Sequence, residues 1–454
     1  MNAPEVLTAT RPFTEAYFHD VAAAIERALR PGEFYTATLS AEMSEFVRFN
    51  RGKVRQPGAV SQAYLDVDLV IGARHAIQRL VLTGDLQRDA AAIDASLRGL
   101  REVVPALAED PHLLHSKEVH GTRSIRGAAL PPAEAIVEEV VALGKDRDLV
   151  GLYAGGPAMR GFANALGQRN WHEVTSFQLQ WSLYHRADKA VKSALSGLAW
   201  DPALLRSRMQ DAEAQLEFIA RPARSLAPGD YRVFLAPAAM EEIVGMLQWG
   251  GFSARALATH QSSLIRMRDD AGVRLDARVN LREATAEGLS PAFQGAGFIR
   301  PDVVPLVEEG QLVGSLVSPR TAREFGLSSN GANADETAEA LVMSGGDLDA
   351  SAVLAALDTG LYVGNLWYLN YSDRPACRVT GMTRFATFWV EHGRIVAPVD
   401  VLRFDDTIFR MLGTNLEALT RDTELRLDSS TYMQRSLSSM RLPGALLTSM
   451  RFTL

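Results

Sequence analysis

The chain has 454 residues, of which 47% are hydrophobic and 22% are charged, and its formal net charge is −7. Such a composition is typical of a folded protein of two or three domains, and it argues against a nucleic-acid-binding surface, which needs a basic face. The first 20 residues lack the segments of a signal peptide, and no apolar run is long enough to cross a membrane. Together with the single cysteine, Cys377, this predicts a protein of the reducing cytoplasm.

The first half of the chain alternates between helical and strand patterns. Apolar residues at helical spacing predict helices at residues 14–30, 86–107, 131–144 and 201–219. Strict alternation of apolar and polar residues predicts half-buried strands at 63–71 and 177–185. The turn from Asn50 to Gly52, between two apolar runs, predicts a hairpin.

Residues 221–230 contain two prolines and one glycine, so we expect them to separate a domain at 1–220 from a domain at 221–454. Short strands dominate the second half, including a hairpin that turns at His392–Gly393. Long helices mixed with antiparallel hairpins predict an α+β fold rather than a doubly wound α/β fold. We expect hairpin strands and long helices in the N-terminal domain, and a mixed or antiparallel sheet with helices in the C-terminal domain.

Generic catalytic motifs are nearly absent. No Walker A motif, G-x-G-x-x-G or G-x-S-x-G is present. His172 and Glu173 begin an H-E-x-x-H pattern, but Ser176 stands where the second histidine is needed. His112, His115 and His120 lie close together in a segment that is more typical of a polar surface loop than of a metal site.

Two further features have competing interpretations. Cys377 lies beside Arg374 and Arg378, and nearby cations lower a thiol pKa, yet a lone cysteine is more often a small packed residue. The aromatic run at 366–371, "LWYLNY", is either the lining of a groove or an ordinary core strand, and the core strand is favoured.

Residues 237–248, "PAAMEEIVGMLQ", have the pattern of an amphipathic helix. Pro237 suits its first turn, and the apolar residues share one face. Gly245 is unusual, because a glycine inside a helix costs about 1 kcal/mol relative to alanine. We therefore expect another group to pack closely against Gly245.

Four segments in order along the chain resemble the TldD/PmbA family, whose paired members TldD and TldE form a peptidase. They are "EFVRFNRGKV", "DKAVKSALSGLAWD", "RPARSLAPGDYRVFLAPAAMEEIVG" and "GMTRFATFWVEHGRIVAPVDVLRFDDTIFRML". In the zinc-bearing members the helix carries H-E-x-x-x-H, which falls here on "EEIVGM". Glu241 and Met246 take the two histidine positions, Glu242 takes the glutamate position, and Gly245 precedes the last ligand position.

The resemblance therefore implies a TldE-like chain that lacks the zinc ligands, contains no cofactor of its own and is inactive alone. It implies a heterodimer with a TldD-like subunit that supplies zinc, and a cleft for an extended peptide, unfolded or modified. Neither nucleic acid nor membrane is expected as a partner. Cys377 lies outside the position expected for the family's cysteine ligand. Our candidates for the peptide cleft are Asn365, Trp367, Tyr368 and Arg384.

Two alternatives remain at this point. The chain acts as a homodimeric peptide-binding or scaffold protein without protease activity, or it is an independent hydrolase that uses Cys377 or the histidines between 112 and 120.

Overall fold

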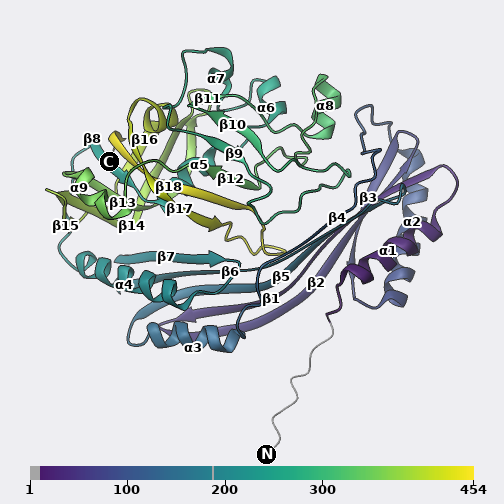
Figure 1. The fold of residues 1–454 in the computed structure, drawn as a ribbon, viewed down its shortest axis with the longest axis horizontal. Helices are drawn as coiled ribbons and strands as arrows, with labels where there is room; N and C mark the ends of the chain where they lie inside the picture. The colour runs from purple at the N-terminus through teal and green to yellow at the C-terminus, as the bar shows by residue number, and fades with distance from the viewer. Residues whose placement is uncertain (1–10, 187–188, 454) are drawn as a thin grey trace, which may run out of the picture.

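The computed structural model describes residues 11–186 and 189–453 and has the predicted α+β fold. Residues 1–10 lie outside the described residues, and they are part of the segment from which we predicted that no signal peptide is present. Asp188, the first residue of "DKAVKSALSGLAWD", also lies outside the described residues. The described residues form a seven-stranded and an 11-stranded sheet (Figure 1). None of the helices within them has the length and apolar character needed to span a membrane.

The N-terminal sheet has the strand order β3-β2-β1-β5-β6-β4, and β7 also pairs with β6. Its pairs are antiparallel except for β4 with β6. Its elements are α1 (Glu15–Ala28), β1 (Glu33–Asn50), β2 (Lys53–Ile71), β3 (Arg74–Leu82), α2 (Leu86–Val103), η1 (Val104–Ala106), β4 (Thr122–Arg126), α3 (Ala133–Leu143), β5 (Asp148–Asn164), β6 (Arg169–Arg186), β7 (Lys189–Gly197) and α4 (Pro202–Ile219).

The predicted hairpin and strands are confirmed. The turn between β1 and β2 places Arg51 and Gly52 at φ 53° and 65°, in the left-handed region that a tight two-residue hairpin turn requires. In β2, Leu65, Val67 and Leu69 are completely buried, as their alternation predicts. The strands extend well beyond the predicted segments, because β2 begins at Lys53.

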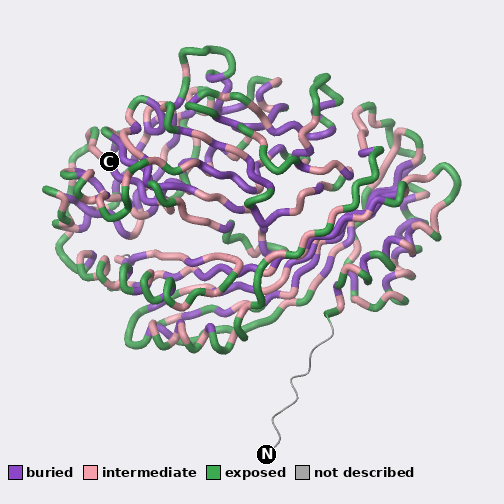
Figure 2. The backbone as a smooth tube through the Cα atoms, viewed as in Figure 1, coloured by how far each residue is buried: buried purple, intermediate pink, exposed green. Residues whose placement is uncertain are grey.

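Helices cover the lower side of the long strands in the view of Figure 1, and the C-terminal sheet lies on the upper side. Thr14 caps α1 by accepting a hydrogen bond from the Tyr17 N–H, and Phe18, Val21 and Ile25 of this helix are fully buried. Figure 2 shows the buried backbone running along the strands where α1 and α2 pack. The apolar face of each helix thus completes the core of the sheet.

The C-terminal sheet has the order β11-β10-β9-β12-β18-β16-β14-β13-β8, with a further pairing of β18 with β8 that closes a circuit of strands. Its elements are β8 (Gly229–Leu235), α5 (Pro237–Leu247), α6 (Ala254–Ala258), α7 (Ile265–Asp269), β9 (Leu281–Glu283), β10 (Val304–Glu308), β11 (Gln311–Leu312), α8 (Pro319–Phe325), β12 (Ala340–Met343), η2 (Ala350–Ala352), α9 (Val353–Leu357), β13 (Gly360–Asp373), β14 (Arg378–Glu391), β15 (Arg394–Pro398), β16 (Arg403–Thr407), η3 (Arg410–Thr414), β17 (Leu416–Leu427) and β18 (Ser439–Phe452).

The predicted hairpin at His392–Gly393 is confirmed as the turn between β14 and β15. The chain passes from α4 to β8 between residues 220 and 228, so the two sheets are built from separate parts of the sequence. The exact division at residue 220 stays a prediction.

The connection between β17 and β18 descends onto the N-terminal sheet (Figure 1). In this docking loop, defined as residues 428–438, Gln434 Nε2 donates to the Ser40 carbonyl at 2.9 Å. The guanidinium of Arg435, which is 3% exposed, lies 3.7 Å from the carboxylate of Glu42 and donates to Ser44 Oγ at 2.8 Å. The docking loop therefore fixes the C-terminal sheet to the strands below it.

A second contact between the two halves involves a buried histidine and is expected to be sensitive to acid. His172 of β6 donates from Nε2 to the Leu289 carbonyl at 2.8 Å, and burial lowers its pKa from 6.5 to about 4. In the unfolded chain the His172 imidazole becomes protonated below about pH 6.5, whereas in the folded chain it becomes protonated only below about pH 4. We therefore expect the free energy of unfolding to fall by up to about 3 kcal/mol as the pH drops through this interval.

Urea titrations at pH 7, 5.5 and 4.5 measure this loss. The variant His172→Gln keeps a side-chain donor but does not titrate, so it should lose less stability over the same interval. An equal loss in the variant would show that other groups cause the acid sensitivity.

Candidate functional site

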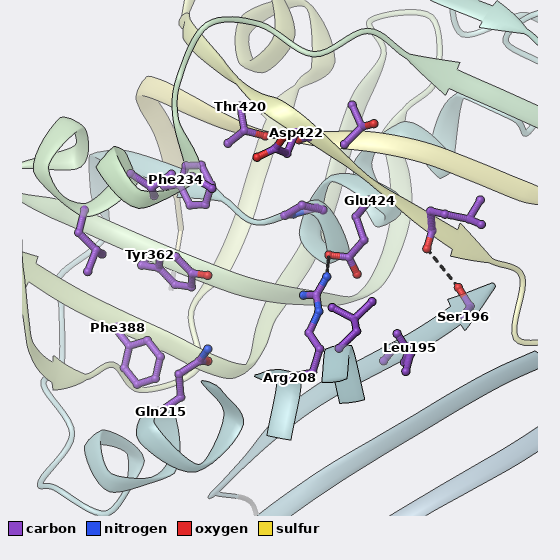
Figure 3. A pocket seen from close by; sticks show the side chains of 18 of the residues that line it. Leu195, Ser196, Arg208, Gln215, Phe234, Tyr362, Phe388, Thr420, Asp422 and Glu424 are labelled. Atoms are coloured by element: carbon purple, nitrogen blue, oxygen red, sulfur yellow. Dashed lines mark hydrogen bonds and ion pairs between the residues drawn. The ribbon is translucent and has the colours of Figure 1, made fainter. Parts of the chain in front are cut away.

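Three adjoining hollows lie between the two sheets and together form the central cleft. The α5 cavity, of about 480 Å³, lies beside helix α5 and includes Lys192 and Arg426 in its walls. A connecting hollow of about 410 Å³ shares these two residues and also contains Arg208 and Glu424. The third, the apolar hollow, shares Arg208 and Glu424 and has a volume of about 590 Å³ (Figure 3). The shared residues show that the three hollows adjoin one another.

Helix α5 follows β8 directly and turns one face into the core. Pro237 is the first residue of the helix. Proline lacks a backbone N–H, but at this position an N–H would have no partner within the helix, so no hydrogen bond is lost. The apolar stripe predicted from the sequence is completely buried: it consists of Met240, Ile243, Val244 and Leu247. Glu241, Glu242 and Gly245 line the α5 cavity on the other side. The helix thus presents adjacent carboxyl groups to the cleft.

The expectation that Gly245 accommodates a close neighbour is wrong. A Cβ atom placed on Gly245 would meet only Cε of Met440, at 3.6 Å, which is an ordinary van der Waals distance. The physical reason is that this residue faces the cavity rather than a packed element.

Replacing Gly245 with alanine should therefore raise the free energy of unfolding by about 0.5–1 kcal/mol, because alanine loses less backbone entropy in a helix. Urea unfolding of the variant measures the gain. Gly444→Ala is the matched control, since its Cβ would meet Cζ of Phe234 at 2.5 Å and should destabilise the protein. A loss of stability in Gly245→Ala would contradict the prediction.

A chain of alternating charges crosses the cleft wall. Arg426 of β17 contacts Glu241 of α5 through Nε at 2.8 Å and Glu424 through Nη1 at 3.0 Å. Glu424 in turn contacts Arg208 of α4 at 2.9 Å. Burial opposes the charge of Arg426, but the two carboxylates prevail and raise its pKa. The network ties α4, α5 and β17 together around a buried cation.

The carboxyl group of Glu242 has a different environment from that of Glu241. Burial raises the pKa of its carboxyl group, and repulsion from Glu241 raises it further, while Lys192 and Arg426 oppose the shift. Lys192 comes from β7 of the N-terminal sheet and lines the same cavity. The α5 cavity therefore holds a carboxyl group and an ammonium group on different walls, both available to a bound molecule.

The donor set at this helix does not fit a zinc ion. Zinc sites in proteins use thiolate, imidazole or carboxylate ligands in tetrahedral arrangement. Glu241 is bound to a guanidinium, and Met246 is only 3% exposed and packs in the core. Across residues 11–186 and 189–453, no group of three or more His, Cys, Asp or Glu side chains has the arrangement of a metal site. No zinc chemistry is assigned to this helix.

The four candidate cleft residues lie on β13 and β14, but they do not share one surface. Asn365 is buried and lines the connecting hollow, opposite Arg384 in the strand pairing. The guanidinium of Arg384 lies 4.6 Å from the ring centroid of Trp367. Trp367 and Tyr368 are 46% and 76% exposed and line none of the three hollows. Only Asn365 is placed in the central cleft.

The favoured interpretation of the run at 366–371 as an ordinary core strand is wrong for its middle residues. The pairing passes from Trp367–Met382 to Asn370–Thr380, so the strand bulges between them. Tyr368 in this bulge has φ 59°, and the bulge turns the two aromatic side chains outward.

Cys377 is completely buried, and burial raises the pKa of its thiol to about 12. The lowered pKa considered for this thiol is therefore wrong. Arg374 opposes the shift, but its effect is smaller than that of desolvation, which disfavours the thiolate. A neutral, inaccessible thiol is a packed residue and not a nucleophile.

The histidines between 112 and 120 do not form one cluster, because His120 lies apart from His112 and His115. His120 is exposed and contacts Glu118 at 2.7 Å, as expected of a surface loop. His115 differs from that expectation: its ring lies 5.5 Å from that of Phe34, and both of its nitrogens are buried without a hydrogen-bond partner among the described residues. His112 and His115 line a smaller cavity with His75, away from α5.

Sequence reasoning missed Arg426, Arg208 and Lys192. In "TELRLDSS" the charges at 424, 426 and 428 alternate with leucines, which is the usual pattern of a strand with one exposed face. No local signal distinguishes a buried cation in such a strand, because its partner Glu241 lies 185 positions away.

Comparison with known proteins adds two findings. Residues 228–454 match the family described as PmbA/TldA metallopeptidase C-terminal domain. No curated protein matches the sequence.

Solved structures share the fold over nearly the whole chain at low identity. TldE from Thermococcus kodakarensis has a TM-score of 0.76 and 13% identity, covering 96% of this chain and 100% of its own. A candidate modulator of DNA gyrase from Thermotoga maritima has a TM-score of 0.73 and 13% identity, with coverages of 97% and 100%. Another, from Bacteroides thetaiotaomicron, has a TM-score of 0.74 and 16% identity, with coverages of 97% and 99%.

Proposed function

From the premise that the chain belongs to the PmbA/TldD family, we propose that it is the subunit without zinc of a TldD/TldE-type heterodimeric peptidase. In this assignment a zinc-bearing TldD-like subunit carries out hydrolysis. The present chain completes a cleft that holds an extended, unfolded or modified peptide, and it is inactive alone. The likeness to TldE supports the fold that this role requires.

The observation that carries the proposal is the ion pair between Arg426 and Glu241. Glu241 stands at the first ligand position of the motif that the resemblance aligns here, and its carboxylate is already bound to a fixed cation at 2.8 Å. A guanidinium in this place repels a metal ion, whereas a zinc site needs free donors. The chemistry of hydrolysis is therefore assigned to another chain.

The central cleft supports the second half of the proposal. An extended peptide can bind by backbone hydrogen bonds to strand edges, which gives low side-chain specificity. The cleft lies between β7 on one wall and α5 with β17 on the other. Lys192 and Glu242 offer charges of opposite sign to the peptide.

Reconstitution tests this function. The purified chain is mixed with a TldD-like relative that carries intact H-E-x-x-x-H, and cleavage of an unfolded peptide is followed with either chain alone and with both. We expect cleavage only in the mixture, or cleavage at least tenfold faster there than with either chain alone. Metal analysis of the present chain should find no stoichiometric zinc. Equal cleavage by the relative alone would overturn the proposal.

A homodimeric peptide-binding or scaffold protein remains the second candidate, because the exposed Trp367 and Tyr368 are the kind of aromatic residues that interfaces use. It predicts a dimer of this chain alone and no complex with a zinc-bearing relative. Light scattering of the chain with and without that relative separates the two functions.

A further inference from the structure

The apolar hollow has the properties of a binding pocket in its own right. Its volume of about 590 Å³ lies within the range of about 300–1,000 Å³ that ligand pockets usually have. It is lined by α4 and β7 of the N-terminal half and by β8, α9, β13, β14 and β17 of the other half. Its apolar lining includes Leu195, Leu204, Phe234, Val353, Tyr362 and Phe388.

Aromatic rings form one side of this hollow (Figure 3). The ring centroids of Phe234 and Tyr362 lie 5.4 Å apart, and those of Tyr362 and Phe388 lie 6.3 Å apart, both in tilted arrangements. Rings at these distances attract further rings through offset or edge contacts. The wall is therefore suited to a planar aromatic group.

A small number of polar groups accompany this wall. The hydroxyl of Tyr362 points toward Arg208 and Glu424 in Figure 3, and Gln215 extends its amide into the same space. Burial and the neighbouring Glu424 raise the pKa of Tyr362, so its hydroxyl keeps its proton and can donate. The Arg208–Glu424 pair marks the passage to the connecting hollow. An aromatic group that carries an acceptor atom matches this arrangement best.

We propose that the apolar hollow receives one aromatic side chain of the peptide in the central cleft, and that it prefers tyrosine. The inference rests on the proposed function, because it takes the cleft to hold an extended peptide. A peptide is chosen over a free aromatic molecule because the apolar hollow adjoins the connecting hollow, with which it shares Pro237, Tyr362 and Arg208. A side chain enters from a backbone that lies along the central cleft.

The test measures fluorescence anisotropy of a labelled Gly/Ser peptide with one guest residue: tyrosine, phenylalanine or alanine. We expect the purified chain to bind the tyrosine and phenylalanine peptides at least tenfold more tightly than the alanine peptide. Tyr362→Phe should abolish the preference for tyrosine over phenylalanine and leave binding of the phenylalanine peptide unchanged, because only the donor is removed.

Leu204→Trp fills the hollow from α4, where Leu204 is 41% exposed and a larger side chain can be placed. This variant should bind the aromatic peptides less than twofold more tightly than the alanine peptide, and its affinity for the alanine peptide should be unchanged. Ala203→Trp, at the adjacent exposed position, lines none of the three hollows and should behave as the wild type.

Each other outcome has a defined meaning. Equal affinity for the three peptides would overturn the aromatic pocket and leave the peptide cleft standing. Equally tight binding of free N-acetyl-tyrosinamide and the tyrosine peptide would overturn the peptide as occupant. Binding of none of the peptides would count against the pocket and also against the cleft of the proposed function.

Discussion

Replacing Arg435 with alanine is expected to lower the free energy of unfolding by about 3–5 kcal/mol, since it leaves a buried charge without its partner. The carboxylate of Glu42 is 2% exposed and has this guanidinium 3.7 Å away. Arg435 also donates to the Ser176 carbonyl of β6 at 3.1 Å and to the Gly156 carbonyl of β5, so one side chain links the docking loop to three strands of the N-terminal sheet, β1, β5 and β6. Its loss should therefore also loosen the contact between the halves.

Two measurements check this expectation. Urea unfolding gives the loss of stability, and limited proteolysis should cut the variant within residues 428–438 at enzyme concentrations that spare the wild type. Arg98→Ala is the matched control, because the Arg98–Asp94 pair has side chains 65% and 55% exposed and should contribute less than about 0.5 kcal/mol. A loss below about 1 kcal/mol for Arg435→Ala would contradict the assigned role.

Replacing Arg426 with alanine is the second change with a large expected effect. It leaves Glu241 and Glu424 without the cation between them, and their side chains are only 25% and 20% exposed. We expect a loss of about 3–5 kcal/mol in the free energy of unfolding at pH 7. Peptide binding should weaken as well, because the network joins α4, α5 and β17 around the cleft.

The double variant Arg426→Leu with Glu241→Leu is the control for this prediction. Removing both partners eliminates the unpaired charge at Glu241, so the double variant should be more stable than Arg426→Ala alone. Urea unfolding of the two proteins side by side makes the comparison. Equal stability would show that the contacts of the arginine stem, rather than its charge, stabilise the cleft wall.

Local sequence patterns predicted most of the fold because they depend on neighbours along the chain. The apolar spacing in 237–248 places four side chains on one face of a helix wherever that helix packs, and all four are buried. The alternation in 63–71 does the same for a strand. The length of β2 was not predictable, because residues 53–62 are largely exposed and have no core pattern.

The site was less predictable because its contacts join distant segments. Arg374 and Arg378 are visible beside Cys377 in the sequence, but the burial that raises its thiol pKa comes from tertiary packing. The outward turn of Trp367 and Tyr368 depends on a bulge in the pairing with β14, which no periodicity reveals. The ion pair between Arg426 of β17 and Glu241 of α5 likewise forms only once the C-terminal sheet has brought these distant segments together.

The position of β18 sets an order of events during synthesis. Every strand of the N-terminal sheet lies before residue 198, so that sheet can form while translation continues. The C-terminal sheet has to wait, because β18 lies inside it and pairs with β8, β12, β16 and β17. Until residues 439–452 leave the ribosome, the apolar edges of those strands remain open to chaperones and to aggregation. Premature stop codons upstream of β18 should therefore yield proteins that cells degrade rather than shortened folded proteins.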